Sequence, residues 1–289
     1  MSGAALIGVD WGSSSLRVFR IGVDGSILET RRSADGVFTG GGPFEDRLRA
    51  VLGDWHEAPI LLCGMVGSDR GWRLAPYVAA PAGVRDIARA MIRAPFDRPA
   101  WIVPGVSFSD GETREVMRGE ETLIAGYLAR STIGRATLCL PGTHSKWADV
   151  VAGRIVGFRT YMTGELRAAL LERGALASGI EQRPSPEEFA RGARAAVSGV
   201  THALFQARAR RLLGTLAPEH TAAFVDGTLI GEEVARETAS DVVLVARGAM
   251  AESYAAALHG RAVTQVDPEP LAAIGLLELA RQAGILPAV

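Results

Sequence analysis

The sequence predicts an α/β protein with two lobes, and three features of the chain support this. Residues 5–31 read as three strands joined by two tight turns, and residues 136–162 repeat that layout. The C-terminal part then alternates apolar strands with helices, which favours parallel strand pairing. Two copies of one layout predict two domains of similar architecture.

Each copy has an apolar strand, a turn rich in glycine and hydroxyl side chains, a second strand, a short glycine turn and a third strand. Asp24-Gly25 between β-rich runs is a strong hairpin signal, and Ala152-Gly153 holds the same place in the second copy. The predicted strands are 5–10, 16–23 and 26–31, then 136–140, 146–151 and 154–162.

The remaining elements follow from apolar periodicity and from the positions of glycine and proline. Between the copies we expect a helix at 44–54, a strand at 59–64, a loop at 65–83, a helix at 84–94 and a strand at 100–105. After the second copy we expect helices at 164–174, 186–216 (one or two), 228–239, 248–260 and 270–284, and strands at 241–246 and 262–267.

Composition excludes several classes of function. Of the 289 residues, 48% are hydrophobic, and Lys+Arg 31 against Asp+Glu 32 gives a net charge of −1. This balance argues against nucleic acid or an anionic membrane as the partner. The chain has no apolar run of the roughly 18 residues that a membrane span needs. Its opening segment reads as a strand rather than a signal peptide, so we expect a cytoplasmic protein. Cys63 and Cys139 lie in apolar runs and are expected to be buried.

The turn after the first predicted strand is the first candidate site. Asp10 ends the strand and is followed by Gly12, Ser13, Ser14 and Ser15. Backbone N–H groups and hydroxyls in such a turn can form a concave anion site. Asp10 would then hold a divalent cation, through water, beside bound phosphates. A plain polar hairpin turn has the same composition, so these residues alone leave both interpretations open.

The matching turn of the second copy, PGTHSKW (141–147), contains Lys146, the only lysine of the chain. Arginine supplies the positive charge elsewhere, so this position suggests a need for a compact ammonium group. We expect Lys146 to contact a phosphate or substrate, with a surface lysine as the alternative. His144 is expected to donate a hydrogen bond rather than act as a base.

Two adjacent carboxylates, Glu120 and Glu121, open a predicted apolar helix at 123–129. Phosphoryl transfer to an alcohol needs a carboxylate within hydrogen-bond reach of the hydroxyl. Consecutive residues do not share a helix face, so at most one of the two takes that role. Acidic residues also favour the first turn of a helix, and the residues alone do not decide between capping and catalysis.

The loop at 64–72 follows a buried strand, where substrate-binding loops are common. Arginines in glycine turns could bind a carboxylate or phosphate, although most arginines are solvated surface charges. The residues expected to bind substrate are Arg17, Gly67, Ser68, Arg70, Trp72 and Arg118. Gly248, where a buried strand turns into a helix, is a candidate contact for the base or ribose of a nucleotide.

Taken in order, these motifs resemble those of the actin-like ATPase superfamily, which includes sugar kinases, hexokinase and heat-shock chaperone ATPases. Within it the chain resembles the 2-dehydro-3-deoxygalactonokinase family. The blocks that carry the resemblance are DWGSSSLR (10–17), GMVGSDRGW (64–72), PYVAAPAG (76–83), VPG (103–105), MRGEET (117–122), PGTHSKW (141–147), MTGEL (162–166) and LIGEEV (229–234).

The resemblance implies a two-lobed actin-like (ribonuclease H-like) α/β fold with duplicated β-sheet domains and a nucleotide cleft between them. The first lobe would be residues 1–110, completed by the C-terminal helix 271–289, and the nucleotide-binding lobe would be 111–270. The implied activity is transfer of a phosphoryl group from ATP, with Mg²⁺, to the terminal (C6) hydroxyl of 2-dehydro-3-deoxy-D-galactonate in galactonate breakdown. The partner is then a small sugar acid, and a homodimer is left open.

Site roles carry over position by position. Asp10 and the turn 12–15 match the first phosphate motif, and Gly142, Thr143 and Lys146 lie in the second. Glu121 stands before a threonine, where hexokinase-like members have their catalytic aspartate; here Glu replaces Asp, and a second glutamate is adjacent. The segment ARGAM (246–250) departs from the usual glycine followed by a small residue, and Gly248 is our choice for the adenosine contact.

Two other functions are weighed against this one. A kinase for a related sugar or sugar acid, such as 2-dehydro-3-deoxygluconate, would share the phosphate motifs, because these do not report on hydroxyl stereochemistry. The fold also serves nucleotide-dependent switch proteins. We favour the switch less, because 289 residues leave no room for an attached peptide-binding domain.

Overall fold

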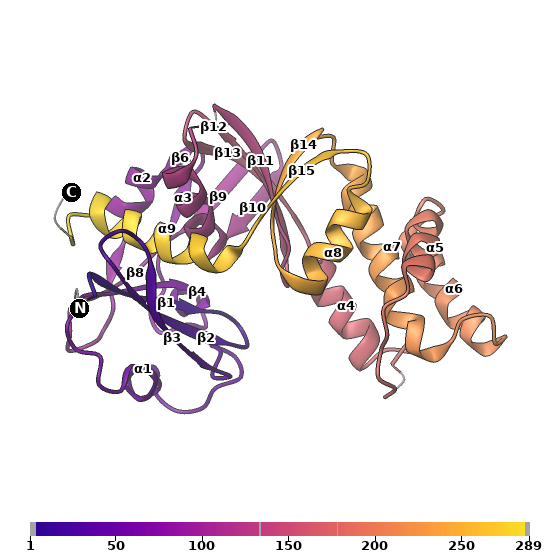
Figure 1. Cartoon of the computed structure of the whole chain (residues 1–289), viewed down its shortest axis with the longest axis horizontal. Helices are drawn as coiled ribbons and strands as arrows, with labels where there is room; N and C mark the ends of the chain where they lie inside the picture. Colours follow the sequence, from indigo (N-terminus) through magenta and orange to yellow (C-terminus); the bar gives the residue numbers. More distant parts are fainter. Residues whose placement is uncertain (1–3, 133, 178, 287–289) are drawn as a thin grey trace. The chain divides into compact units, whose positions relative to one another are not determined.

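The computed structural model describes residues 4–132, 134–177 and 179–286, and the chain divides into two compact units (Figure 1). Unit 1 comprises Met1–Ala136, Ala148–Phe158 and Asp267–Val289, and unit 2 comprises Thr137–Trp147 and Arg159–Val266. The lobe boundaries expected at 110 and 271 stay a prediction. Within the residues described, none of the helices has both the length and the apolar character needed to cross a membrane.

The first sheet of unit 1 has the strand order β3-β2-β1-β4-β8-β7. β1, β2 and β3 pair antiparallel, as predicted, and Gly25 in the second turn has a φ of 85°, which favours glycine. β1, β4 and β8 run parallel, so β1 and β4 end side by side. The bounds are β1 (Leu6–Trp11), β2 (Leu16–Ile21), β3 (Ile27–Ser33), β4 (Ile60–Gly64), β7 (Ile92–Arg93) and β8 (Ala100–Ile102).

Successive side chains of β1 point to opposite faces of this sheet. Ile7, Val9 and Trp11 join the core that includes Leu48 and Leu52 of α1 (Phe44–Leu52). On the other face, α9 (Pro268–Gln282) packs against β1 and against α3 (Glu120–Arg130), as Figure 1 shows. α9 begins as the sequence suggests, since the side chain of its N-cap, Asp267, accepts a hydrogen bond from the N–H two residues on (2.8 Å).

Two glycines let α3 and α9 approach closely. A Cβ atom on Gly126 would lie 2.0 Å from the carbonyl oxygen of Leu271, and one on Gly275 would lie 1.9 Å from that of Thr122. Because backbone atoms occupy the space, a larger side chain at either position would push the helices apart.

Residues 77–117 hold most of the differences from the predicted elements. The helix expected at 84–94 is wrong in its second half: α2 ends at Arg89, because Ile92 and Arg93 pair with β8 and extend the sheet. A small sheet, β10-β9-β5, was not predicted, and its hairpin turns at Gly111, whose φ is 55°. The bounds are β5 (Tyr77–Ala79), β6 (Ala82–Gly83), α2 (Val84–Arg89), β9 (Gly105–Asp110) and β10 (Thr113–Met117), with a 3₁₀ turn η1 (Met65–Gly67).

The third sheet has the order β15-β14-β11-β12-β13-β6. Its strands β11, β12 and β13 are neighbours in chain order, which confirms the repeated three-strand layout. β14 pairs in parallel with both β11 and β15, as the alternating C-terminal pattern predicts. The bounds are β11 (Arg135–Leu140), β12 (Ser145–Val151), β13 (Arg154–Tyr161), β14 (Asp241–Val245) and β15 (Ala262–Val266). Cys63 and Cys139 are both buried and free, as expected.

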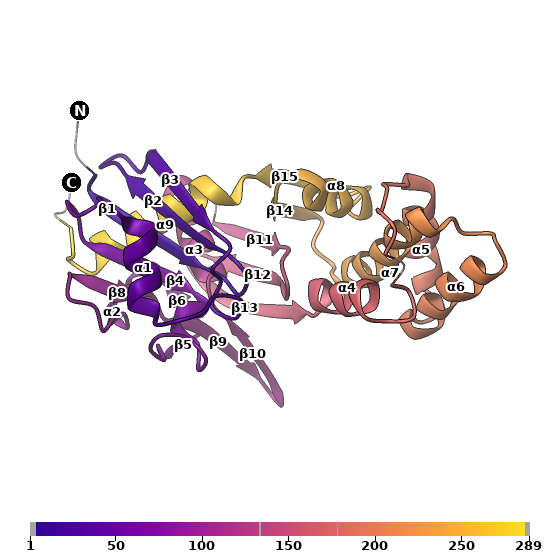
Figure 2. The same cartoon turned by 90° about the horizontal axis from the view of Figure 1, so that it is seen from below.

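Helices make up most of the rest of unit 2. Figure 2 shows α5, α6 and α7 side by side, and α5 meets α7 at Gly192 and Gly227, where a Cβ atom would lie 2.1 Å and 1.9 Å from facing carbonyl oxygens. The segment 186–216 forms two helices, separated at Gly199 (φ 102°). α7 begins seven residues before the predicted 228. The bounds are α4 (Thr163–Glu172), α5 (Pro186–Ala196), α6 (Val200–Leu212), η2 (Pro218–His220), α7 (Thr221–Arg236) and α8 (Gly248–Ala257).

Candidate active site

The turn after β1 is held by main-chain hydrogen bonds. The N–H of Gly12 donates to the carbonyl of Ser15 (2.9 Å), and residues 37 and 38 donate to the carbonyls of Gly12 and Ser13 (both 2.9 Å). Ser14 and Ser15 are exposed. The turn therefore presents hydroxyls to solvent on a fixed backbone, which suits contact with an anion.

Asp10 lies beside this turn and is ion-paired with Arg17, with 2.5 Å between Oδ2 and Nη2. The end of β4 comes close, because a Cβ atom on Gly64 (φ 87°) would lie 3.5 Å from Asp10 Oδ1 and 2.7 Å from the Trp11 carbonyl oxygen. The start of α3 adjoins the same place, since a Cβ atom on Gly119 (φ 109°) would lie 3.4 Å from the Cα of Gly64. Unit 1 thus brings the ends of β1 and β4 and the start of α3 together at two glycines with positive φ.

The two glutamates at the start of α3 have different surroundings. Glu121 is fully buried; its Oε2 accepts the N–H of Gly119 (2.7 Å) and its Oε1 accepts the hydroxyl of Thr122 (3.2 Å). Burial raises the pKa of Glu121 to about 8, and the charge of Glu120 adds to this rise. Glu120 is half-buried and accepts the N–H of Arg118 (3.1 Å). Both carboxylates therefore cap the N-terminal end of α3, and Glu120 is the more accessible.

Arg118 and Ser68 contribute unpaired buried donors to the loops of unit 1. Arg118 Nη2 donates to the carbonyl of Ala75 (2.8 Å), and its Cζ lies 4.4 Å from the centre of the Tyr77 ring. Arg118 Nε, Arg118 Nη1 and Ser68 Oγ are buried with no hydrogen-bond partner among the residues described. A Cβ atom on Gly67 would lie 2.9 Å from Arg118 Nη1, so glycine makes room for the guanidinium group. A buried donor without a partner costs about 1–3 kcal/mol, so these groups suit a ligand that accepts hydrogen bonds.

The other substrate candidates in this loop have different environments. Trp72 stacks on Phe44 (6.3 Å between ring centres) and meets the ring of Phe96 edge-on (5.8 Å). It packs against the hydrophobic core of unit 1. Arg70 is exposed, with its Cζ 4.2 Å from the centre of the Phe38 ring. The structure therefore groups Gly67 and Ser68 with Arg118, whereas Trp72 packs among aromatic side chains.

Residues 4–132, 134–177 and 179–286 contain no cluster of three or more His, Cys, Asp or Glu side chains that could hold a metal ion. A Mg²⁺ ion that accompanies a nucleotide needs fewer protein ligands, because water and phosphate oxygens complete its coordination. Asp10, held by Arg17 beside an exposed hydroxyl turn, fits that smaller role.

The second turn, in unit 2, packs directly against the start of α4. A Cβ atom on Gly164 would lie 2.3 Å from the Gly142 carbonyl oxygen, and the N–H of Glu165 donates to the carbonyl of Thr143 (2.9 Å). His144 Nε2 lies within hydrogen-bond distance of Glu165 Oε2 (2.5 Å). Lys146 is only 4% exposed, and its Nζ donates to the carbonyl of the histidine (2.9 Å). The alternative interpretation of Lys146 as a surface lysine is therefore wrong.

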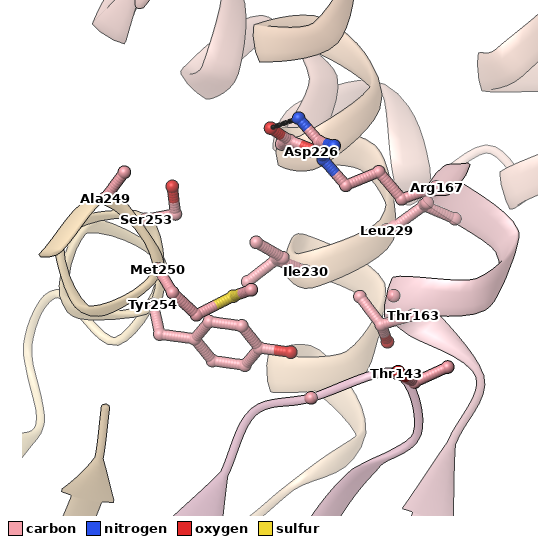
Figure 3. A pocket seen from close by; sticks show the side chains of 12 residues that line it. Thr143, Thr163, Arg167, Asp226, Leu229, Ile230, Ala249, Met250, Ser253 and Tyr254 are labelled. Atoms are coloured by element: carbon pink, nitrogen blue, oxygen red, sulfur yellow. Dashed lines mark hydrogen bonds and ion pairs between the residues drawn. The ribbon is translucent and has the colours of Figure 1, made fainter. Parts of the chain in front are cut away.

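Unit 2 contains a pocket of about 380 Å³ beside this turn (Figure 3). Figure 3 shows Met250 and Tyr254 of α8 facing Ile230 of α7 and Thr163 of α4. Apolar walls with a few polar groups are typical of small-ligand sites. The residues that line the pocket are Gly142, Thr143, Thr163, Gly164, Arg167, Asp226, Leu229, Ile230, Ala249, Met250, Ser253 and Tyr254.

The polar end of the pocket is an ion pair between Arg167 Nε and Asp226 Oδ1 (2.5 Å). Burial raises the pKa of Asp226, and the arginine opposes that rise. Gly248, with a φ of 59°, opens α8 just before Ala249 and Met250, which line the pocket. The predicted adenosine segment thus adjoins the pocket, although Gly248 is not one of the lining residues.

The sequence model of the 2-keto-3-deoxy-galactonokinase family matches residues 10–279, which include both turns, both glutamates and every lining residue of the pocket. The chain belongs to this family. Two curated members are each 37% identical to it. One, assigned as a 2-dehydro-3-deoxygalactonokinase from Rhizobium meliloti (strain 1021), aligns over 94% of this chain and 95% of its own. The other, the 2-dehydro-3-deoxygalactonokinase of Escherichia coli (strain K12), aligns over 80% of each.

Solved structures agree with this family and with the expected fold. A crystal structure assigned to a 2-dehydro-3-deoxygalactonokinase from Sinorhizobium meliloti is 35% identical, with a TM-score of 0.84 over 98% of this chain and 100% of that one. The activator of 2-hydroxyisocaproyl-CoA dehydratase from Clostridium difficile, solved with bound ADPNP, is 13% identical, with a TM-score of 0.53 over 98% of each chain. The latter likeness concerns the fold alone. The actin-like ATPase fold predicted from the sequence is confirmed.

The sequence did not identify several pocket residues of this 2-keto-3-deoxy-galactonokinase family member. Thr163 and Gly164 lie in the MTGEL block, and Leu229 and Ile230 lie in LIGEEV, so the blocks marked the right segments without assigning roles. Arg167, Asp226 and Ser253 lie on helices outside any motif. Their proximity depends on how α4, α7 and α8 pack, which no local pattern encodes.

Proposed function

We propose that this protein is an ATP-dependent kinase that phosphorylates the terminal (C6) hydroxyl of 2-dehydro-3-deoxy-D-galactonate in galactonate breakdown. The observation that carries the proposal is the family match over residues 10–279. Two relatives with 37% identity bear the name of this activity. The cytoplasmic location and the homodimer considered above stay predictions.

ATP is proposed to bind in the pocket of unit 2. Leu229, Ile230 and Met250 offer apolar surface for the adenine ring. The lining also contains Gly142 and Thr143, which begin the second turn, and their N–H groups would contact phosphate oxygens. The structure of a fold relative with bound ADPNP supports use of a nucleotide.

The first turn and Asp10 are proposed to act on the phosphate end of the reaction. Ser14 and Ser15 are exposed and would donate hydrogen bonds to phosphate oxygens. Asp10 would hold Mg²⁺ through water, and the ion would neutralise charge that develops on the phosphates. The ion pair with Arg17 keeps the Asp10 side chain oriented beside the turn.

A carboxylate at the start of α3 is proposed to orient the acceptor hydroxyl and accept its proton. Glu121 takes the position implied by the family resemblance, and its raised pKa of about 8 makes its carboxylate a stronger base than usual. It is fully buried, so contact with a substrate requires the loops around Gly64 and Gly119 to shift. Glu120 is the accessible alternative in the same helix turn.

Paired variants separate the two glutamates. If Glu121 is the base, Glu121→Gln lowers kcat by about 10²–10⁴-fold with little change in nucleotide affinity, whereas Glu120→Gln keeps most of the turnover. The reverse pattern would assign the role to Glu120. Near-normal turnover in both variants would remove the carboxylate base from the proposal.

The carboxylate of the sugar acid is proposed to bind Arg118 and Ser68. Their unpaired buried donors would gain an acceptor, and bidentate pairing of guanidinium with carboxylate is strong and directional. The ring of Tyr77 packs against the guanidinium group of Arg118. Arg118→Lys should then raise the KM for the acceptor about tenfold or more and leave the KM for ATP unchanged.

The experiment that tests the function measures ADP release from ATP and Mg²⁺ with three acceptors in separate reactions. These are 2-dehydro-3-deoxy-D-galactonate, its gluconate epimer and galactose. Selective turnover of the galactonate supports the proposal. Turnover with another acceptor alone would replace the substrate and keep the kinase, and turnover that ignores every acceptor would favour a nucleotide-driven switch.

A further inference from the structure

Glu233 of α7 is a buried carboxylate that receives hydrogen bonds from three different elements of unit 2. It is 1% exposed. Its Oε1 accepts the indole N–H of Trp147 (2.8 Å), and its Oε2 accepts the hydroxyls of Tyr254 (2.8 Å) and Thr163. These donors come from β12, α8 and α4.

The network continues to the second turn. The Oγ of Ser145 lies 2.7 Å from the phenol oxygen of Tyr254. A phenol has one proton, so when Tyr254 donates it to Glu233, Ser145 is the donor to Tyr254. The Glu233 network therefore includes both Trp147 and Ser145, and these two residues flank Lys146 in the chain.

The same partners lie around the pocket. Thr163 and Tyr254 are lining residues, as Figure 3 shows, whereas Glu233 and Trp147 do not line the pocket. Burial raises the pKa of Glu233, and the donors from Thr163, Trp147 and Tyr254 oppose that rise. Burying a carboxylate is costly, and here it is compensated by donors from β12, α4 and α8, of which Thr163 and Tyr254 line the pocket.

We propose that Glu233 is a positioning residue for nucleotide binding, which fixes the second turn, the start of α4 and the face of α8 in their binding geometry. It acts through Ser145, Trp147, Thr163 and Tyr254 and needs no contact with the nucleotide. This inference rests on the proposed function in one respect, namely that the pocket of unit 2 binds the nucleotide. It gives a role to the LIGEEV block, whose acidic residues otherwise have none.

Glu237 provides a matched control on the same helix end. It is also a buried carboxylate (4% exposed), and it pairs with Arg159 (2.8 Å) and accepts the hydroxyl of Tyr161 (2.8 Å). Neither of these partners lines the pocket. Glu237→Gln therefore removes a buried charge of the same kind without touching the pocket walls.

The experiment compares Glu233→Gln, Glu237→Gln and the unmodified chain by calorimetric titration with ADP and by steady-state kinetics. A side-chain amide cannot accept all three donors in their present positions, so Glu233→Gln should weaken ADP binding and raise the KM for ATP by about tenfold. The KM for the acceptor should stay within about twofold, because the altered contacts are confined to the nucleotide side. Glu237→Gln should leave ADP affinity unchanged and lower only the melting temperature.

A second pair of variants keeps the test decisive if Glu233→Gln folds poorly. Thr163→Val keeps the shape of the side chain and removes its donor, so it should weaken ADP binding by several-fold, about 1 kcal/mol of hydrogen-bond energy. Thr163→Ser keeps the hydroxyl and should bind ADP like the unmodified chain.

The outcomes separate this inference from the proposed function. Normal ADP affinity in Glu233→Gln, or equal losses in Glu233→Gln and Glu237→Gln, would overturn the positioning role even if the kinase activity is confirmed. Weakened ADP binding in Glu233→Gln alone would support the role even if 2-dehydro-3-deoxy-D-galactonate is not phosphorylated.

Discussion

Replacing Glu121 by Gln should change how the stability of the protein depends on pH. Burial raises the pKa of this carboxyl from its ordinary value of 4.5 to about 8. A group whose pKa is higher in the folded than in the unfolded state stabilises the fold fully below its unfolded pKa. That stabilisation is lost as the pH rises through the folded pKa. Ionised Glu121 therefore destabilises unit 1 increasingly from about pH 5 to 8.

The magnitude follows from the size of the pKa change. At about 1.4 kcal/mol per pKa unit, the full difference is on the order of 5 kcal/mol, and about 3 kcal/mol of it is lost between pH 5 and 8. Glutamine resembles the protonated acid and can still accept the N–H of Gly119. The free energy of unfolding of Glu121→Gln should therefore fall less over this range than that of the unmodified chain.

The assay is urea unfolding at pH 5.0, 6.5 and 8.0, followed by tryptophan fluorescence and circular dichroism. Comparing how the free energy of unfolding changes with pH in two proteins cancels the contributions of histidines and other groups that titrate in both. Glu120→Gln is the control. It removes the charge of Glu120, which contributes to the raised pKa of Glu121, but leaves Glu121 buried, so most of the pH dependence should remain. If the free energy of unfolding fell equally between pH 5.0 and 8.0 in Glu121→Gln and in the unmodified chain, within about 0.5 kcal/mol, the reasoning would be refuted.

Three further outcomes are expected. Lys146→Met should raise the KM for ATP about tenfold or more, and Lys146→Arg should also have a raised KM for ATP, as kinetics at varied ATP would show. The reason is that the buried space beside His144 suits an ammonium rather than a planar guanidinium group. Gly126→Ala should lower the free energy of unfolding by about 3 kcal/mol, because the new Cβ would clash with the Leu271 carbonyl oxygen. Thermal melts would test this against Gly41→Ala as the control, since no atom lies within 4 Å of a Cβ at that position. Asp10→Asn should lower kcat by about 10²-fold and weaken the dependence of the rate on Mg²⁺ concentration, and an unchanged Mg²⁺ profile would argue against a role in metal binding.

The strand framework was predictable because its signals are local. Asp24-Gly25 and the alternation in β1 and β2 need no distant partner, and the repeat at 136–162 follows the same rules. The prediction was wrong where the conformation of a segment depends on pairing with a distant strand. Ile92 and Arg93 continue a helical pattern in sequence, but pairing with β8 makes them an edge strand.

The candidate site was predictable to the extent that each motif is a continuous stretch of chain. Asp10 and the turn 12–15 belong together through the backbone, and Lys146 was singled out by composition. The near approach of Gly64 to Gly119 was not predictable, because it joins two loops more than fifty residues apart. The same holds for Asp226 and Arg167, which meet through the packing of α4 on α7.

The distribution of these residues between the units makes the proposals separately testable. Asp10, both glutamates and the Arg118 cluster lie in unit 1, whereas every lining residue of the pocket and the whole Glu233 network lie in unit 2. Variants that remove contacts of the pocket or of the Glu233 network should therefore shift ADP affinity and leave the KM for the acceptor unchanged, and Arg118→Lys should do the reverse. If Arg118→Lys weakened ADP binding as strongly as Glu233→Gln, the assignment of the acceptor carboxylate to Arg118 would be wrong.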